Sequence, residues 1–270
     1  MPIRFRAAPE CPPTSHRLAQ KLLMRGVITS GGPEEGGLEL VCEAEGLTLV
    51  AHQGTDPPLA LNIDLTGGTR GYRQARAAQS REDLVRSLGR LPRGSQILDA
   101  SAGLGRDALV LAAWGFEVLA LERSPVLAAL LADALERASA HEALRAPLAR
   151  VDLQQGDVRQ WLSRHGRVFD AAVFDPMFPP RRKNAQVKKD MRVLHRLLGA
   201  DADSDAPETL AVLLRHVRHS VVVKRPLHAP CLGDLKPARS LRGRSTRFDV
   251  YLPKVPAGHP PESSLAVSRS

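Results

Sequence analysis

Small residues and carboxylates recur where short apolar runs of the sequence end. One apolar run closes on Asp99, and Gly103 and Gly105 follow within six residues. Glycines there allow a tight turn and a close approach of the backbone to a ligand, at the edge where doubly wound sheets bind nucleotides. The next apolar run ends in Glu122, and the third is followed by Asp157. Because a carboxylate at the position of Glu122 can accept hydrogen bonds from both ribose hydroxyls, these residues predict an adenosine-sized pocket.

The charge of the glycine-rich turn separates two possible cofactors. A dinucleotide enzyme would normally show the spacing G-x-G-x-x-G, but here Arg106 and Asp107 follow the second glycine and no third glycine is present. Carboxylates at both ends of the turn, Asp99 and Asp107, would repel a pyrophosphate, whereas they suit the ammonium and sulfonium groups of S-adenosylmethionine (SAM). The turn therefore favours SAM. Two alternatives stay open, namely glycines that serve packing alone and a carboxylate, Asp157, that caps a helix.

The most specific pattern is F-D-P-M-F-P-P at residues 174–180, where a fourth apolar run ends. It resembles the (D/N)-P-P-(Y/F/W) loop of enzymes that methylate amino groups. An exocyclic amine conjugated to a base is a poor nucleophile, so acceptors on its N–H groups must hold it in line with the methyl donor. We expect Asp175 and the Pro176 carbonyl to orient the amine and Phe178 to stack on a flipped-out base. The alternative is a proline-rich turn with a buried phenylalanine.

Positive charge is concentrated in two segments of the chain. Residues 159–196 hold ten Lys/Arg against three Asp, a net charge of +7, and residues 224–247 hold seven against one, a net charge of +6. The whole chain carries +9, so the remaining residues are at −4. Such clustering indicates a polyanionic partner such as RNA, with solvated faces as the alternative. The predicted RNA contacts are Arg181, Arg182, Lys183, Lys188, Lys189, Arg192, Lys224 and Arg225.

Four ordered motifs resemble the ribosomal RNA small subunit methyltransferase J family. They are D-A-S-A-G-L-G-R-D-A at 99–108, L-E-R-S-P at 121–125, F-D-P-M-F-P at 174–179 and V-V-V-K-R-P at 221–226. The resemblance implies a class I Rossmann-like methyltransferase fold, SAM as cofactor, and methylation of the exocyclic N2 amine of a guanosine in 16S ribosomal RNA. It implies small-subunit rRNA or the 30S particle as partner. The cofactor contacts it implies are Arg106, Asp107, Glu122, Arg123, Asp157, Val158 and Asp175, to which the glycine-rich turn adds Asp99, Gly103 and Gly105.

Alternating apolar runs and helical segments predict a mostly parallel, doubly wound α/β sheet. Strands are expected at 96–100, 117–121, 149–154, 169–174, 220–224 and 246–252, and helices at 75–88, 106–114, 125–139, 158–164, 187–198 and 208–216. Proline and glycine clusters around short alternating runs predict a small β-rich amino-terminal unit over residues 1–65. The methyltransferase domain would span 66–252, and the Pro-, Gly- and Ser-rich tail at 253–270 is expected to be disordered.

Composition narrows the class of protein. The 270 residues are 43% hydrophobic and only 4% aromatic, so aliphatic side chains must form the core of a soluble protein. Cys11, Cys42 and Cys231 are far apart and lack ligand spacing, which predicts neither a disulfide nor a metal site. No apolar stretch has the length of a signal peptide or membrane span, and we therefore expect a cytoplasmic protein. The oligomeric state is unknown from the sequence.

Two further hypotheses compete with rRNA methylation. Related loops act on DNA bases and on protein glutamine, so the substrate could differ while the chemistry stays the same. Alternatively, the chain could be a non-catalytic RNA-binding module that keeps a nucleotide-binding fold without using it. Binding of S-adenosylhomocysteine separates that module from the enzymes, and the chemistry of the substrate separates the enzymes from one another.

Overall fold

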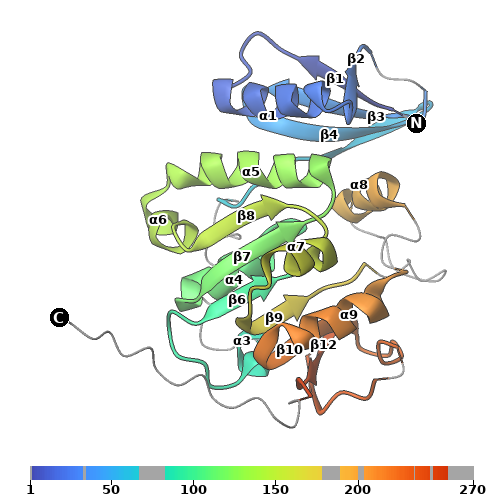
Figure 1. Cartoon of the computed structure of the whole chain (residues 1–270). Helices are drawn as coiled ribbons and strands as arrows, with labels where there is room; N and C mark the ends of the chain where they lie inside the picture. Colours follow the sequence, from blue (N-terminus) through green and yellow to red (C-terminus); the bar gives the residue numbers. More distant parts are fainter. Residues whose placement is uncertain are drawn as a thin grey trace.

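The computed structural model describes residues 2–32, 35–66, 83–177, 189–199, 204–233, 235–243 and 246–254. The described strands form two sheets, a smaller one from the amino-terminal residues and a larger one from the rest of the chain. The two sheets lie on either side of helix α5 (Figure 1). The larger sheet is the predicted doubly wound one, and it carries the residues whose chemistry is of interest.

The larger sheet has the strand order β11-β12-β10-β9-β6-β7-β8. Its strands are β6 (Gln96–Asp99), β7 (Glu117–Glu122), β8 (Val151–Gln155), β9 (Phe169–Phe174), β10 (Val217–Pro226), β11 (Arg239–Arg242) and β12 (Thr246–Tyr251). The strands from β8 to β10 run parallel, whereas β12 is antiparallel to both β10 and β11. The chain runs outward from β6 to β8 and then returns to β9 on the other side of β6. The order therefore reverses between β6 and β9, which is where such sheets bind ligands.

Helices cover both faces of this sheet (Figure 1). Ile97 packs into one core cluster and its neighbour Leu98 into the other, because successive residues of a strand point to opposite faces. The helices on the Ile97 face are α3 (Asp83–Leu88), α4 (Arg106–Trp114), α5 (Pro125–Ser139) and α6 (Glu142–Leu148). Helices α7 (Val158–His165) and α9 (Ala206–Arg215) lie on the Leu98 face. The functional edge is thus held between two layers of helices.

Local signals in the sequence fix the ends of α4 and α5, whose bounds match the prediction. Gly115 follows α4 with a φ of 105°, a left-handed conformation that costs glycine no steric clash. Ser124 caps α5 by accepting the N–H of Leu127. Pro125 occupies the first turn, where its missing N–H is not needed. Gly115 thus sets where the chain enters β7 at the amino edge of the sheet, and Ser124 and Pro125 set where it leaves β7 at the carboxyl edge.

The amino-terminal unit is a sheet of order β2-β1-β3-β4-β5 with a helix of its own, α1, packed on it. Its elements are β1 (Ile3–Ala7), α1 (Pro13–Met24), β2 (Ile28–Ser30), β3 (Leu38–Glu43), β4 (Gly46–Gln53) and β5 (Asp56–Leu61). Helix α1 and strand β4 pack against α5, and helix α8 (Lys189–Leu198) packs against β4 and β5. The apolar residues of this unit belong to the same core cluster as those on the Ile97 face of the larger sheet.

A buried carboxylate on α5 joins the two sheets. Asp133 is 1% exposed and accepts hydrogen bonds from the Ser15 hydroxyl, from the Leu47 N–H at 3.1 Å and from Arg137 Nε at 2.8 Å. Gly46 leaves room for this group, because a Cβ at Gly46 would stand 2.5 Å from Asp133 Oδ2. Polar contacts as well as apolar packing therefore hold the amino-terminal unit on α5.

The prediction that the cysteines form no disulfide is wrong for one pair. Cys11 and Cys42 are joined by a disulfide, with 5.3 Å between their Cα atoms. The parallel register of β1 and β3 sets Ala7 opposite Cys42, and the turn after β1 then brings Cys11 back to it. Because the two cysteines are 31 residues apart in the sequence, their spacing did not indicate this proximity. Cys231 has a free, exposed thiol.

Six elements were not predicted individually from the sequence, namely α1, α6, β1, β2, β5 and β11. Helix α6 contains Pro147, and β5 includes Pro57 and Pro58, which are typical of turns; β5 tolerates them because it is an edge strand. Of the helix predicted at 75–88, residues 75–82 lie outside the described residues, as do residues 255–270 of the predicted tail. No helix in the described ranges is long and apolar enough to cross a membrane.

Candidate active site

The turn after β6 and the loop after β9 are tied together at the carboxyl edge of the sheet. The two strands are adjacent, with Asp99 in register with Val173. Ser101, two residues beyond β6, accepts the N–H of Asp175 at 2.8 Å through its hydroxyl oxygen. The backbone of the predicted catalytic loop is thereby fixed against the glycine-rich turn.

Glu122, at the end of β7, holds the glycine-rich turn in place. Its carboxylate is 6% exposed and accepts the N–H of Gly103 at 2.9 Å and the N–H of Ser124 at 2.8 Å. Gly103 has a φ of 53°, which favours glycine. Gly105 has a φ of 73°, and a Cβ on it would stand 2.5 Å from a methyl carbon of Leu131 in α5. Gly103 therefore serves the turn, and Gly105 serves the close packing of α4 on α5.

A cavity of about 260 Å³ opens above these loops. Eight of the ten predicted cofactor residues line it, namely Gly103, Arg106, Asp107, Glu122, Arg123, Asp157, Val158 and Asp175. Asp99 and Gly105 are not among the lining residues. The strand ends of β6, β7 and β9 and the loop after β8 therefore converge on one space, as the spacing of the sequence indicates.

Asp99 lies beside the cavity in a strongly acidic environment. Its side chain is buried, Oδ1 accepts the N–H of Ser101 at 3.2 Å, and Oδ2 has no hydrogen-bond partner among the described residues. Burial above all, together with the nearby carboxylates of Asp107, Asp175 and Glu122, raises the pKa of Asp99 to about 8. Negative potential therefore accumulates at this edge, which suits a ligand that carries a sulfonium and an ammonium group.

Lys224 stands between two carboxylates of the cavity wall. Its Nζ lies 3.0 Å from Asp107 Oδ2 and 2.9 Å from Asp175 Oδ2, and its side chain is 28% exposed. Burial opposes the charge of Lys224, but the two carboxylates outweigh burial and raise its pKa above the ordinary value. The lysine is thus a permanent cation at the junction of α4, β9 and β10.

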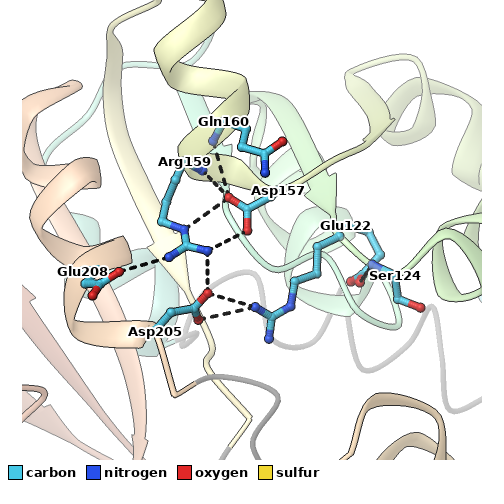
Figure 2. A network of polar contacts seen from close by, with 8 residues as sticks. Glu122, Ser124, Asp157, Arg159, Gln160, Asp205 and Glu208 are labelled. Carbon is cyan, nitrogen blue, oxygen red and sulfur yellow. Dashed lines mark hydrogen bonds and ion pairs between the residues drawn. The ribbon is translucent and has the colours of Figure 1, made fainter.

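A network of alternating charges borders the cavity near α7 and α9 (Figure 2). Asp157 caps α7 by accepting the N–H of Arg159 at 2.9 Å and also pairs with the Arg159 guanidinium at 3.1 Å. Arg159 reaches Asp205 at 2.6 Å and Glu208 at 3.2 Å, and Asp205 also pairs with Arg123 at 3.3 Å. Burial opposes ionisation of Asp157, yet its hydrogen bonds with Arg159 and the backbone lower its pKa. Asp157 is therefore both a helix cap and part of the cavity wall.

Helix α8 closes the cavity with apolar side chains and is anchored on the amino-terminal unit. Met191, Leu194 and Leu198 line the cavity. Arg192 donates to Gln53 Oε1 at 2.7 Å, and Arg196 donates to the carbonyl oxygen of His52 at 2.7 Å and to that of Gly36. The high amphipathicity of the helix explains this double contact, since one face meets the cavity and the core while the other carries the arginines.

The predicted substrate-binding residues fall into three groups. Phe178, Arg181, Arg182, Lys183 and Lys188 lie outside the described residues. Asp175 lines the cavity, Pro176 is buried beside it, Lys189 begins α8, and Arg192 on α8 donates to Gln53. Arg225 is 3% exposed and donates to the Pro230 carbonyl oxygen at 2.5 Å, which contradicts the expectation that it contacts RNA. Lys224 lies in the cavity wall instead of on an outer basic surface.

Sequence reasoning missed several residues of the site. Ser101, Asp205 and the apolar side chains of α8 were not predicted to line the cavity. Ser101 lies inside the glycine-rich motif, so its position was a usable signal. Asp205 comes from the far end of the chain, and no local pattern indicates that it meets Arg123. No cluster of three or more His, Cys, Asp or Glu that could hold a metal ion occurs in the part of the chain that the structure describes.

Comparison with known proteins agrees with this geometry. A family model described as a putative SAM-dependent methyltransferase matches residues 24–253. A Thioalkalivibrio sulfidiphilus protein named ribosomal RNA small subunit methyltransferase J is 45% identical over 218 residues, covering 80% of this chain and 84% of the relative. A Coxiella burnetii protein of the same name is 43% identical over 202 residues, covering 74% and 78%. The crystal structure of a Neisseria gonorrhoeae SAM-dependent methyltransferase superposes with a TM-score of 0.69 at 27% identity, covering 93% of this chain and 96% of that one.

Proposed function

The chain belongs to the ribosomal RNA small subunit methyltransferase J family of SAM-dependent methyltransferases, and we propose that it methylates the exocyclic N2 amine of a guanosine in 16S rRNA. The observation that carries the proposal is the position of Asp175. Its carboxylate lines the same cavity as Glu122 and Asp107, at the point where the strand order reverses. A hydrogen-bond acceptor for the amine and the groups suited to the methyl donor therefore share one space.

The carboxylates of the cavity fit a cationic adenosine ligand. Glu122 would hold the ribose hydroxyls, and the α7 start with Asp157 and Val158 would meet the adenine edge. Arg106, Asp107 and Arg123 would hold the amino-acid end, where a carboxylate and an ammonium need opposite partners. When bound, SAM supplies an electrophilic methyl group. The unpaired oxygen of Asp99 and its raised pKa support this assignment, because a positive ligand nearby would relieve the repulsion among the carboxylates.

The protein's part in the reaction is to place and hold the amine. Asp175 and the carbonyl of Pro176 would accept hydrogen bonds from the N–H groups of the guanine, which directs the nitrogen lone pair toward the methyl donor. Phe178 would stack on the base. The basic residues Arg181, Arg182, Lys183, Lys188 and Lys189 would contact phosphates beside the extruded nucleotide. No covalent intermediate with the protein is needed.

We propose that the protein acts in the cytoplasm on small-subunit rRNA or on a 30S particle, because the proposed substrate is found there. Cytoplasmic thiols are kept reduced, so in the cell we expect Cys11 and Cys42 to be largely dithiol. The name shared by the relatives favours rRNA over a DNA base or a protein glutamine. A non-catalytic module is disfavoured because it would not need the donor-binding and acceptor-binding carboxylates in one cavity.

Methyl transfer from labelled SAM tests the proposal directly. Purified protein is incubated with naked small-subunit rRNA and with 30S particles from a strain that lacks the gene, and the product nucleoside is identified by mass spectrometry. We expect one N2-methylguanosine per 16S rRNA. Asp175→Ala should reduce the rate by about 100-fold or more, because the amine loses an oriented acceptor.

The matched control is Asp152→Ala, which removes an exposed carboxylate on β8 that does not line the cavity. This variant should methylate at the wild-type rate. Label on a DNA base or a protein glutamine, with none on rRNA, would replace the proposed substrate. Absence of S-adenosylhomocysteine binding in calorimetry would reject the enzyme itself.

A further inference from the structure

Lys224 forms ion pairs with two carboxylates that line the cavity. It lies on β10, which is the neighbour of β9, so its side chain reaches the same carboxyl edge as the Asp175 loop. Its ammonium is 2.9 Å from Asp175 and 3.0 Å from Asp107. Asp175 belongs to the acceptor side and Asp107 to the donor side of the proposed reaction. One cation therefore connects the groups that must align the two reactants.

The backbone and the side chain of Asp175 are each held by a partner. Its backbone N–H binds the hydroxyl oxygen of Ser101 at 2.8 Å, and its side-chain Oδ2 binds Lys224. The carboxylate is 44% exposed, so without a partner it would move among several rotamers. Two fixed contacts restrict the orientations that this side chain can take. Preorganisation of this kind matters because a catalytic group displaced by about 1 Å loses much of its effect.

Contact of Lys224 with RNA is the competing role. The lysine side chain is 28% exposed and is already engaged by two carboxylates, so a phosphate would have to share the ammonium with both of them. Such a phosphate would also lie beside Asp107 and Asp175 and be repelled by them. The surroundings of Lys224 therefore favour a role inside the cavity.

We infer that Lys224 is a positioning residue that holds the Asp175 carboxylate in its catalytic orientation and links it to Asp107. The inference rests on the proposed function, since it assigns Asp175 as the acceptor for the amine. Lys224 acts through Asp175 and does not itself touch the reacting nitrogen. The ion pair holds the carboxylate in place at the cavity wall.

Three measurements on Lys224→Gln separate this role from the others. We expect the single-turnover rate of methyl transfer to fall by about 10- to 100-fold. The Kd for S-adenosylhomocysteine, measured by calorimetry, and the Kd for 30S particles should each change by less than about threefold. Lys224→Arg should transfer methyl faster than Lys224→Gln, because it restores the cation with altered geometry. Lys21→Gln is the charge-matched control, since Lys21 is exposed on α1 and does not line the cavity.

A double-mutant cycle tests whether the lysine acts through Asp175. In an Asp175→Asn background, Lys224→Gln should slow transfer by less than about threefold, because the carboxylate that it positions is gone. Thermal unfolding checks that each variant is folded. If the glutamine variant unfolds, Lys224→Met takes its place in every measurement, since it keeps an unbranched apolar stem in the same space.

The outcomes distinguish failure of the proposed function from failure of the role inferred for Lys224. No transfer by the wild-type enzyme would reject the proposed function, whatever the variants do. With an active wild type, a Lys224→Gln rate equal to wild type would overturn the inference. So would a defect confined to RNA affinity and removed by lower salt, or a full 10- to 100-fold loss that persists in the Asp175→Asn background.

Discussion

Replacing Asp133 by alanine tests how the amino-terminal unit is held on α5. The carboxylate is 1% exposed and accepts three hydrogen bonds, from Ser15 in α1, Leu47 in β4 and Arg137 one helical turn away. Removing it leaves the Leu47 N–H without its acceptor and the Arg137 guanidinium without its nearest negative charge. Both consequences destabilise the junction between the two sheets.

The magnitude follows from what is left behind. Breaking a buried ion pair by removing one partner costs about 3–5 kcal/mol. The Arg137 side chain is 26% exposed and also donates to the Ile63 carbonyl oxygen at 2.7 Å, so it keeps part of its solvation and one partner. We therefore expect the free energy of unfolding to fall by about 3 kcal/mol. Asp133→Asn keeps one acceptor oxygen and should lose roughly half as much.

Urea unfolding, followed by far-ultraviolet circular dichroism, measures these values. Glu136→Ala is the control, because Glu136 is an exposed carboxylate on the same helix. It should stay within about 0.5 kcal/mol of wild type. An Asp133→Ala variant as stable as the Glu136→Ala variant would refute the reasoning that this carboxylate joins the sheets.

Three further predictions concern pH, donor recognition and redox state. Burial and the neighbouring carboxylates raise the pKa of Asp99 to about 8, so between about pH 4 and pH 8 the unfolded chain releases a proton that the folded protein keeps, and the contribution of Asp99 lowers wild-type stability as the pH rises through this range. Asp99→Asn lacks this loss, and urea unfolding at pH 5 and pH 8.5 should show it gaining on wild type at the higher pH. Asp205→Asn should weaken S-adenosylhomocysteine binding about tenfold in calorimetry by releasing Arg123 and Arg159, whereas Glu208→Gln, whose side chain is 79% exposed, should leave the Kd unchanged. Equal Kd values would reject a role for Asp205. Reduction of the disulfide, which spans 31 residues, should lower the free energy of unfolding by about 3–4 kcal/mol without slowing methyl transfer by folded enzyme; a slower rate at full folding would contradict that.

Elements with local signals could be predicted from the sequence. Helices α4 and α5 were predicted residue for residue, because Gly115, Ser124 and Pro125 mark their ends. Helix α1 was missed because it lacks a side-chain cap and begins within a pair of prolines, Pro12 and Pro13, that is typical of a loop. The cavity could be located because carboxyl ends of parallel strands meet at one edge of a sheet.

Contacts between distant segments could not be predicted in this way. Lys224 and Arg225 were treated alike as basic residues, yet neighbours on a strand point to opposite faces, so one lines the cavity and the other is buried near Pro230. Period-two alternation could have separated them. The Cys11–Cys42 bond depends on the pairing of β1 with β3, which no pattern within either strand reveals.

Helix α8 serves two parts of the molecule at once. It presents Met191, Leu194 and Leu198 to the cavity, while Arg192 and Arg196 bind the end of β4 and the chain before β3. No described residue of strands β1 to β5 lines the cavity. Substitutions that destabilise the amino-terminal sheet should nevertheless loosen the apolar wall that α8 provides. The affinity for the methyl donor should then fall, although no described residue of that sheet lines the donor's cavity.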